Sequence, residues 1–469
     1  PPMQFVSTRG SAPALAFDEV LLTGLAADGG LYLPADWPAF GGQSWRRLAK
    51  LGYVGLAREV LRPFLRGSVV EPELESLLQR AYASFGHQAV APLKQLDRDL
   101  WLMELFHGPT LAFKDVALQL LGQLFERVLA IRGERLTIVG ATSGDTGSAA
   151  IEACRDRPGL EIVMLHPKGR TSEVQRRQMT TVLAPNVTNV AIEGSFDDCQ
   201  DLVKALFADE QFRRRHRLSA VNSINCARIL AQSVYYCWAA LALGAPEREV
   251  AFVVPSGNFG NVYAGYVAKQ MGLPVGRLTV ASNRNDILAR FFRDGAMELR
   301  AVEPSLSPSM DIQVSSNFER LLFDLLDRDG PATARTLTDF RKSGRLTLDQ
   351  AKVDRARRLF GAGRVSDEGT LAEIRRVYET TGEVLDPHTA VGAAVAREAA
   401  PRFRGPTVVL ATAHPAKFPD AVEGAIGQRP ALPPRLADLY DRPERCETLA
   451  NDVQALKALI EQSKERRAA

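Results

Sequence analysis

One lysine lies where a lysine is electrostatically unfavourable. Lys114 follows the turn-forming stretch HGPT and opens an apolar pattern of helical spacing in HGPTLAFKDVAL, residues 107–118. A helix N-terminus carries partial positive charge, so an ammonium there should lose its proton more easily. The neutral amine is a nucleophile that forms a Schiff base with an aldehyde. The alternative is a surface lysine of an ordinary amphipathic helix, where most lysines lie.

A second segment, VGATSGDTGSAA (139–150), combines hydroxyls with glycine after an apolar run. Hydroxyls and free backbone N–H groups at a helix N-terminus form an anion site suited to a carboxylate. A plain glycine turn with an Asp or Thr N-cap accounts for the same pattern equally well. The residues with this potential are Thr142, Ser143, Asp145 and Thr146.

A third segment, VVPSGNFGN (253–261), also runs from an apolar stretch through glycines into a helical pattern. Glycine lets the backbone approach a ligand closely, and N–H groups at the helix start converge on what we predict to be a phosphate. The spacing is neither GxGxxG nor GxxxxGK[ST], which weakens the dinucleotide and nucleoside-triphosphate interpretations. A Rossmann dehydrogenase would carry that missing glycine fingerprint.

The segment LATAHPAKF (410–418) ends an apolar run at Thr412. A hydroxyl there can hydrogen-bond a ring nitrogen and leave a pyridine uncharged. His414 and Lys417 are more often structural in such a place. A lysine, a phosphate cradle, a carboxylate pocket and a hydroxyl facing a ring nitrogen together indicate a pyridoxal phosphate site acting on an amino acid.

The elements that must position these residues follow an α/β pattern. Short apolar runs alternate with amphipathic helices from about residue 93, which predicts a mostly parallel sheet with ligands beyond the carboxyl ends of its strands. The helix that Lys114 opens is expected to close at Gly133. Residues 305–376 are predicted to be a helical insertion without a clear strand, and the tail after about 430 to be helical. The predicted strands are 136–140, 161–167, 189–194, 250–257, 277–283 and 407–414.

Composition excludes several classes of partner. The 469 residues carry a net charge of only +3, which argues against nucleic acid or an acidic membrane surface. The basic run RRRHR at 213–217 is interpreted as a solvated helix end. No stretch reaches the roughly 20 apolar residues of a membrane span. The cysteines are odd in number and scattered, so we expect no disulfide framework, no metal site and a reducing cytoplasm; they are Cys154, Cys199, Cys226, Cys237 and Cys446.

Together with the opening FVSTRG…DGGLYLP, the motifs HGPTLAFKD, TSGDTG, PSGNFGN and LATAHPAKF resemble the threonine synthase family from residue 4 to about 425. The similarity is greatest to the longer form of the enzyme. It implies a tryptophan synthase β-like enzyme of fold type II, with two parallel-sheet α/β domains and the site between them. The implied division is an N-terminal domain (1–92), a large cofactor domain (93–114 and 235–430, with the insertion), a small domain (115–234) and a helical tail (431–469).

The resemblance also implies an activity and residue roles. The enzyme would convert O-phospho-L-homoserine and water to L-threonine and phosphate, the last step of threonine biosynthesis. Lys114 looks like the Schiff-base lysine, next to Phe113, and Thr412 like the partner of the pyridine nitrogen. Asp145 falls where relatives in the wider fold usually place an Asn, which leaves the partner of the cofactor's ring hydroxyl open. The phosphate loop would comprise Gly257, Asn258, Phe259, Gly260 and Asn261.

The substrate would be held by residues that resemble those of the family. Asn222, Ser223 and Arg228, in VNSINCARILAQ (221–232), are similar to the residues that hold the substrate's own phosphate, and a guanidinium suits a phosphate dianion. Thr146 is a further phosphate candidate, beside Thr142 and Ser143. A lyase that releases 2-oxobutyrate, a dehydratase and a non-catalytic paralogue are the alternatives. The sequence leaves monomer and dimer open.

Overall fold

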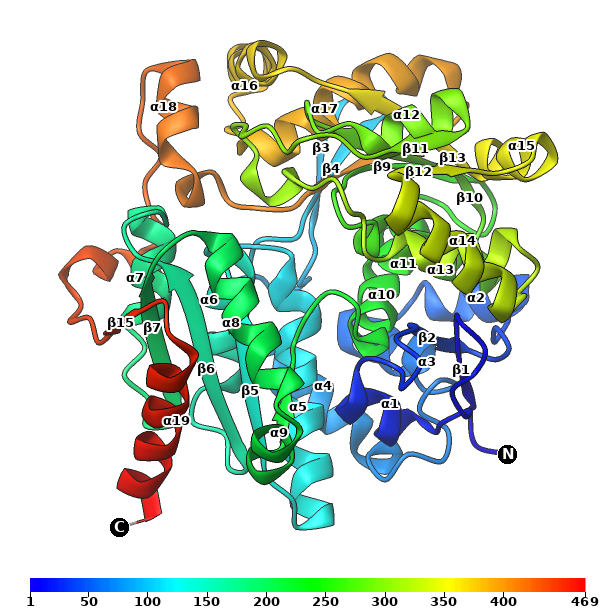
Figure 1. Cartoon of the computed structure of the whole chain (residues 1–469). Helices are drawn as coiled ribbons and strands as arrows, with labels where there is room; N and C mark the ends of the chain where they lie inside the picture. Colours follow the sequence, from blue (N-terminus) through cyan, green and yellow to red (C-terminus); the bar gives the residue numbers. More distant parts are fainter. Residues whose placement is uncertain (469) are drawn as a thin grey trace. The chain divides into compact units, whose positions relative to one another are not determined.

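The computed structural model describes residues 1–468, and their contacts divide them into two compact units (Figure 1). Unit 1 comprises residues 1–21, 25–117 and 223–430, and the described part of unit 2 comprises residues 22–24, 118–222 and 431–468. Over the described part of the chain, we find no helix with the length and apolar character to span a membrane.

The core of unit 1 is a six-stranded sheet with the order β13-β10-β9-β14-β4-β3. All neighbours run parallel except the edge strand β3, which is antiparallel to β4. Three of the predicted strands are confirmed, at β9, β10 and β14. The strands are β3 (Leu93–Asp97), β4 (Leu100–Glu104), β9 (Val250–Pro255), β10 (Val275–Ser282), β13 (Phe360–Arg364) and β14 (Thr407–Ala411).

The central strands β9 and β14 are buried along their whole length, as expected where helices cover both faces of a sheet. Helices α16 (Asp367–Thr381) and α17 (Pro387–Ala399) lie together at the top of Figure 1, with α17 against β14 and β9. A Cβ atom at Gly392 of α17 would lie 3.0 Å from both Pro255 and Val409. The missing side chain therefore lets the helix approach the sheet closely.

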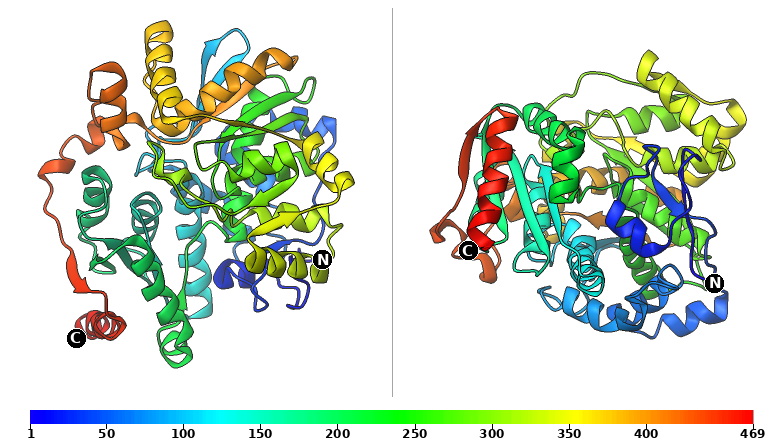
Figure 2. Two further views of the ribbon diagram at one scale, coloured as in Figure 1. Left: turned by 45° about the horizontal axis from the view of Figure 1, so that its top comes forward. Right: turned by 60° about the horizontal axis from the view of Figure 1, so that its bottom comes forward.

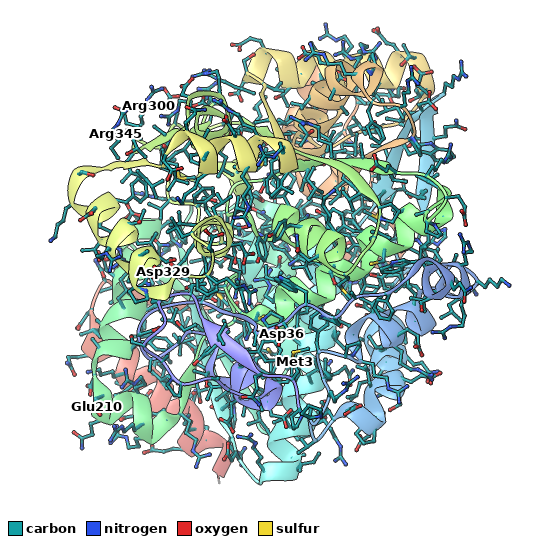
Figure 3. The ribbon with its side chains drawn as sticks, turned by 90° about the vertical axis from the view of Figure 1, so that its right-hand side faces the viewer. Met3, Asp36, Glu210, Arg300, Asp329 and Arg345 are labelled. Atoms are coloured by element: carbon teal, nitrogen blue, oxygen red, sulfur yellow. The ribbon has the colours of Figure 1, made fainter. Side chains whose placement is uncertain are left out.

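The prediction of no strand within 305–376 is wrong. Strand β13 has the sequence FGAGR and pairs in parallel with β10, from Leu278 opposite Phe360 to Ser282 opposite Arg364. Its two glycines have low strand propensity, which hides the strand in the sequence. The short strand β12 (Arg345–Thr347) pairs with β11 (Ala296–Glu298), with Glu298 opposite Arg345, which is labelled in Figure 3.

Unit 2 contains a five-stranded parallel sheet with the order β15-β7-β6-β5-β8. The three predicted strands of this region are confirmed at β5, β6 and β7. Helix α8 (Phe196–Ala208) contributes Cys199, Leu202 and Leu206 to the core beside this sheet. The strands are β5 (Leu136–Ala141), β6 (Leu160–Pro167), β7 (Val187–Glu193), β8 (Leu218–Ser219) and β15 (Glu447–Ala450).

The sequence predicts a helical C-terminal tail, and the structure differs because the tail also contains a strand. Strand β15 joins the sheet at the edge formed by β7 before helix α19 (Val453–Ala468) begins. A four-residue, mostly exposed edge strand carries too little hydrophobic pattern to be recognised from sequence. Figure 2 shows α19 lying along unit 2, where Leu456 and Ile460 are buried in its core.

The carboxylate of Asp28 connects several parts of the N-terminal segment through hydrogen bonds. Strands β1 (Phe5–Ser7) and β2 (Tyr32–Pro34) pair antiparallel, and Asp28 accepts hydrogen bonds from the Ser7 hydroxyl and the Gly30 amide between them. The amides of Ser11 and Ala12 donate to the same carboxylate. Burial raises the pKa of Asp28, but these hydrogen bonds outweigh it and hold the pKa below the usual 3.8.

We expect Asp28→Asn to lower the free energy of unfolding by about 1 to 2 kcal/mol, because the charge that strengthens these hydrogen bonds is lost. A carboxylate whose pKa is lowered in the folded state stabilises at pH values above its unfolded pKa, and that stabilisation is lost as the pH falls through the folded pKa. The difference between Asp28→Asn and wild type should therefore vanish in acid. Denaturant unfolding between pH 7 and pH 3 measures it, with Asp36→Asn, an exposed aspartate, as the control. Equal stability at pH 7 would contradict the role given to Asp28.

Candidate active site

Lys114 is the first residue of helix α5 (Lys114–Arg132), as predicted, and the loop before it is tied to the end of strand β14. The amide of Phe113 donates to the carbonyl of Thr412 at 2.8 Å, and the amide of His414 donates to the carbonyl of Leu111 at 2.9 Å. Leu111 holds a left-handed conformation, with φ of 66°. Lys114 and Phe113 are half-buried. The backbone thus places the lysine beside Thr412.

Two further side chains fix this loop, and the role of one of them, Asp115, was not recognised from the sequence. Asp115, which is fully buried, accepts hydrogen bonds from the Thr110 amide (2.8 Å) and hydroxyl (2.7 Å). Lys417, also fully buried, donates to the Thr110 carbonyl at 2.8 Å. A Cβ atom at Gly108 would lie 2.3 Å from that of Asp115. Lys417 is therefore structural, in line with the prediction, and Asp115 shapes the turn that presents Lys114.

The loop 256–261 has the properties of a phosphate site. It leads from β9 into the N-terminus of helix α11 (Gly260–Gln270), where N–H groups attract an anion. Phe259 has φ of 68°, and its buried ring contacts Phe292, Phe318 and Phe360, so its side chain anchors the loop in the core. A Cβ atom at Gly257 would lie 3.0 Å from Ile312, so this position has little room for a side chain.

Two polar atoms of this loop test whether it fits a phosphate. The Ser256 hydroxyl and the Asn261 amide nitrogen are buried and have no hydrogen-bond partner among the described residues. Tyr235 donates to Asn261 Oδ1 at 2.6 Å and Tyr236 donates to it at 2.9 Å, which directs the Asn261 nitrogen to the opposite side. Buried donors of this kind require an acceptor. The loop therefore fits the phosphate of a cofactor.

Sheet order brings these parts together. Strands β4, β14 and β9 are neighbours and run parallel. The Lys114 loop, Thr412 and loop 256–261 follow their carboxyl ends in turn. Adjacent strands lie about 4.8 Å apart, so these three features share one edge of the sheet, where α/β proteins bind ligands.

Ser223 and Arg228 belong to the same unit. Helix α10 (Cys226–Ala242) is capped by Asn225, whose side chain accepts from the Ala227 amide at 3.0 Å. Arg228 lies in the first turn and is only 2% exposed. A cation in this position is disfavoured by both the helix dipole and burial. That placement is typical of an arginine that binds an anionic ligand.

The loop 142–146 and Asn222 belong to unit 2. The Thr142 hydroxyl accepts from the amides of Gly144 and Gly147, each at 2.9 Å, and so shapes the start of helix α6 (Asp145–Cys154). Ser143 and Asn222 are exposed, whereas Asp145 is 7% exposed. Substrate contacts by Thr142, Ser143, Thr146 and Asn222, and a cofactor contact by Asp145, stay predictions.

A group of residues in the insertion holds the site and was not recognised from the sequence. Ser315 donates through its hydroxyl to the Gly257 carbonyl at 2.7 Å. The Asn317 amide donates to the Asn258 carbonyl at 2.9 Å, and its side chain donates to the Ser223 carbonyl at 3.1 Å. Asn317 therefore connects the phosphate loop with Ser223. No local pattern in SSNFER signals this role, because every partner is distant in sequence.

Arg320, in helix α13 (Phe318–Leu325), extends the connection to the N-terminal segment. Its guanidinium is fully buried. It donates hydrogen bonds to the Asn317 side chain and to the carbonyls of Tyr32 (3.0 Å) and Ile224 (2.7 Å). The adjacent Glu319 accepts from the Thr8 hydroxyl at 2.5 Å and pairs with Arg9. The motif STRG near the N-terminus thus serves to hold α13 against the site.

We expect Asn317→Ala to lower the free energy of unfolding by about 2 to 3 kcal/mol, because the buried Arg320 loses an acceptor and the half-buried carbonyl of Ser223 loses its donor. Retention of the cofactor should weaken as well, since the backbone amide of residue 317, which donates to Asn258 of the phosphate loop, loses the side-chain contacts that hold it in place. Thermal unfolding with and without added cofactor measures both effects. Asn451→Ala, at an exposed position, is the matched control. An Asn317→Ala protein with unchanged stability and cofactor affinity would contradict this role.

Comparison with known proteins agrees with this geometry. A family model described as pyridoxal-phosphate dependent enzyme matches residues 86–413, which include the sheet, the lysine loop and the phosphate loop. The fold and the site thus define a pyridoxal-phosphate-dependent enzyme of fold type II. Models for the N terminus and the C-terminal part of threonine synthase match residues 4–82 and 389–460. The chain belongs to the threonine synthase family.

Full-length relatives support this assignment. The threonine synthase of Pseudomonas aeruginosa is 57% identical over 98% of each chain. The crystal structure of PLP-bound threonine synthase from Brucella melitensis is 51% identical, covers 98% of this chain and 99% of its own, and superposes with a TM-score of 0.96. The yeast threonine synthase structure is 39% identical over 99% of each chain, with a TM-score of 0.95. The cofactor of the family is pyridoxal 5′-phosphate.

Proposed function

We propose that the protein converts O-phospho-L-homoserine and water to L-threonine and phosphate. The observation that carries this proposal is the meeting of Lys114, Thr412 and loop 256–261 at the carboxyl ends of three adjacent strands. Pyridoxal phosphate supplies an electron sink that stabilises negative charge on the substrate's carbon chain. The protein has to hold the reactants and move protons.

Lys114 is proposed as the covalent anchor of the cofactor and then as the base that moves protons at the substrate's α-carbon. Its place at the start of α5 favours the neutral amine that both roles need. Ser256, Asn261 and the amides at the start of α11 would bind the cofactor's phosphate. The Thr412 hydroxyl would accept or donate at the ring nitrogen without adding charge, and Phe113 would lie beside the cofactor.

Arg228, Ser223 and Asn222 are proposed to bind the phosphate of the substrate, with Thr146 as a further contact. A guanidinium donates two parallel hydrogen bonds to a phosphate, and short polar side chains donate to its remaining oxygens. Thr142 and Ser143 would contact the substrate's carboxylate. These assignments rest on the burial of Arg228 at a helix N-terminus and on the similarity of the motifs.

The working environment is proposed to be the cytoplasm. The five cysteines are free thiols in the structure, which suits a reducing compartment. The partner is a small molecule, with no role for nucleic acid or membrane, and the state in solution is a monomer or a dimer.

Product analysis by NMR tests the proposal. Purified protein loaded with cofactor and incubated with O-phospho-L-homoserine should yield threonine and phosphate in equal amounts. Phosphate accompanied by 2-oxobutyrate would replace the synthase with a lyase on the same site. Turnover of threonine or serine, without release of phosphate from phosphohomoserine, would point to a dehydratase.

A further inference from the structure

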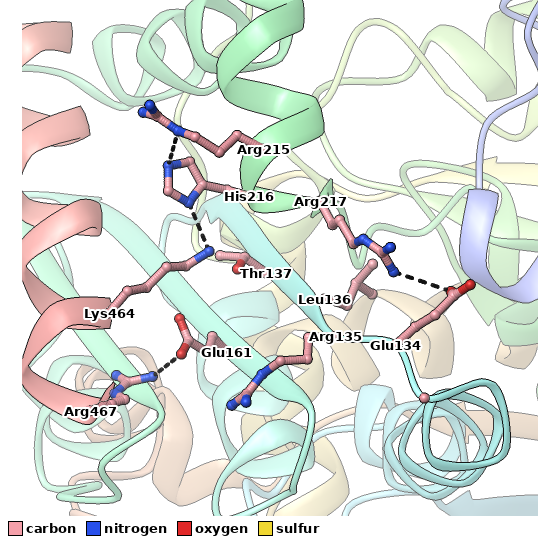
Figure 4. Close-up of a pocket in the computed structure, with 11 residues that line it drawn as sticks. Glu134, Arg135, Leu136, Thr137, Glu161, Arg215, His216, Arg217, Lys464 and Arg467 are labelled. Atoms are coloured by element: carbon pink, nitrogen blue, oxygen red, sulfur yellow. Dashed lines mark hydrogen bonds and ion pairs between the residues drawn. The ribbon is translucent and has the colours of Figure 1, made fainter. Parts of the chain in front are cut away.

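Unit 2 contains a pocket at the end of its sheet opposite to the loop 142–146. Residues at the amino ends of β5 and β6, the end of helix α9 (Glu210–His216) and the last turns of α19 enclose a volume of about 450 Å³ (Figure 4). Strand β5 has six residues, so the two ends of the sheet are separated by roughly 20 Å. Within unit 2, the pocket is therefore separate from the loop 142–146.

The side chains that line this pocket are mostly cationic. Arg217 pairs with Glu134 at 3.7 Å, and Arg467 pairs with Glu161 at 3.0 Å. These are the only two carboxylates in the lining that the structure describes, so three further cationic side chains remain, namely Arg135, Arg215 and Lys464. Arg215 is satisfied by Glu461, outside the lining. The pocket thus holds more positive charge than its own carboxylates balance.

The positive charge that these carboxylates do not balance lies on Arg135 and Lys464. Arg135 is exposed at the pocket rim and has no hydrogen bond or ion pair with any described residue. Lys464 donates to Nδ1 of His216 at 2.9 Å, while Arg215 points its Nε at the other ring nitrogen from 3.3 Å. A neutral imidazole accepts at one nitrogen only, so the ring satisfies only one of these two donors, and its Nε2 also lies 3.6 Å from the Glu461 carboxylate that pairs with Arg215. Figure 4 shows the ring between the two cations.

The titration behaviour agrees with this crowding. Burial lowers the pKa of Lys464, Glu161 opposes that effect, and the neighbouring Arg135, Arg467 and Arg215 lower it further. Burial likewise lowers the pKa of His216, together with the charges of Lys464 and Arg215, whereas Glu461 opposes these effects. Cations this close to one another destabilise each other until an anion lies between them.

We propose that this pocket binds a compact anion that carries phosphate groups, with Arg135 and Lys464 as its principal donors. Arginine offers paired donors in the geometry that phosphate oxygens accept, and the lysine adds a point charge. The described lining has no phenylalanine, tyrosine or tryptophan on which a nucleobase could stack. A phosphate or pyrophosphate group, free or on a small metabolite, matches the charge better than a nucleotide does.

Isothermal titration of the holoenzyme with pyrophosphate tests this proposal. Arg135→Gln should weaken binding by about tenfold, because one charge-assisted contact is lost, and Lys464→Gln should act similarly. Arg214→Gln is the matched control, since it removes the same charge from α9 at an exposed position that pairs with Glu210 outside the pocket. Pyrophosphate bound elsewhere, including at the proposed substrate site, should bind equally well to all three variants. Binding at such sites is thereby distinguished from binding in the pocket.

The outcomes discriminate clearly. Weakening by Arg135→Gln and Lys464→Gln but not by Arg214→Gln supports the pocket, and inorganic phosphate that binds with the same dependence identifies the free ion as a sufficient ligand. Equal weakening by all three variants would mean a general charge effect and would overturn the site. Tighter binding of citrate than of pyrophosphate, with the same dependence on Arg135, would overturn the assignment to phosphate. Failure of wild type to bind pyrophosphate at millimolar concentration would end the proposal.

Discussion

Lys114→Ala should abolish threonine formation, with a loss in kcat of at least about 10⁴-fold, because the residue is proposed both to anchor the cofactor and to move protons. The visible absorbance of the lysine-bound cofactor should disappear in the same variant. Lys114→Arg should be equally inactive, since a guanidinium keeps the charge but is not a nucleophile. Stopped assays for phosphate release and absorbance spectra of the purified variants provide both readouts.

Two controls make the result specific to Lys114. Lys204→Ala removes an exposed lysine of unit 2 and should leave kcat and the spectrum unchanged. Reduction of the wild type with borohydride, followed by peptide mass analysis, should place the cofactor on the peptide that contains Lys114. Attachment at Lys417 would contradict both the assignment and the structural role of Lys417, whose ammonium donates to Thr110.

Arg228→Ala should lower kcat/KM for O-phospho-L-homoserine by roughly 10² to 10⁴-fold, because two charge-assisted hydrogen bonds to the substrate's phosphate are lost. The spectrum of the bound cofactor should not change, since Arg228 is assigned to the substrate and not to the cofactor. Competitive inhibition by inorganic phosphate should weaken in parallel with kcat/KM. Steady-state kinetics with phosphate as the inhibitor measures both.

Arg228→Lys separates binding from packing. It keeps a cation in the first turn of α10 but loses the forked geometry, so we expect activity between those of wild type and Arg228→Ala. Arg135→Gln, in the pocket of unit 2, should leave kcat/KM unchanged. An Arg228→Ala enzyme with normal KM and normal inhibition by phosphate would show that this arginine is structural and that the substrate's phosphate is bound elsewhere.

The parts of the fold that depend on local pattern could be predicted from sequence. Buried parallel strands such as β9, VAFVVP, are continuous apolar runs, and Lys114 begins a helix because an apolar helical pattern follows a Gly-Pro turn. The meeting of three strand ends follows from the general rule for α/β sheets. That rule, and not any single motif, places Lys114, Thr412 and loop 256–261 at one edge.

What could not be predicted depends on contacts between distant residues. Asn317 and Ser223 are separated by 94 residues, and Lys417 and Thr110 by 307, so no window of sequence contains both partners. Strand β13 was missed because glycine has low strand propensity. Its glycines allow close packing, since a Cβ atom at Gly363 would lie 2.9 Å from Val395. Tertiary contacts override local propensity at such a position.

The buried arginine of α13 also has a consequence for synthesis of the chain on the ribosome. Arg320 binds the carbonyl of Tyr32 across 288 residues, and translation at about 5 to 20 residues per second needs roughly 15 to 60 seconds to cover that separation. During this time strands β1 and β2 lack both Arg320 and the Glu319 carboxylate that binds Thr8 and Arg9. Phe5 and Tyr32, buried in the finished protein, would meanwhile be accessible to chaperones. The segment that contains β1 and β2 is thus among the last parts of the fold to be fixed in place.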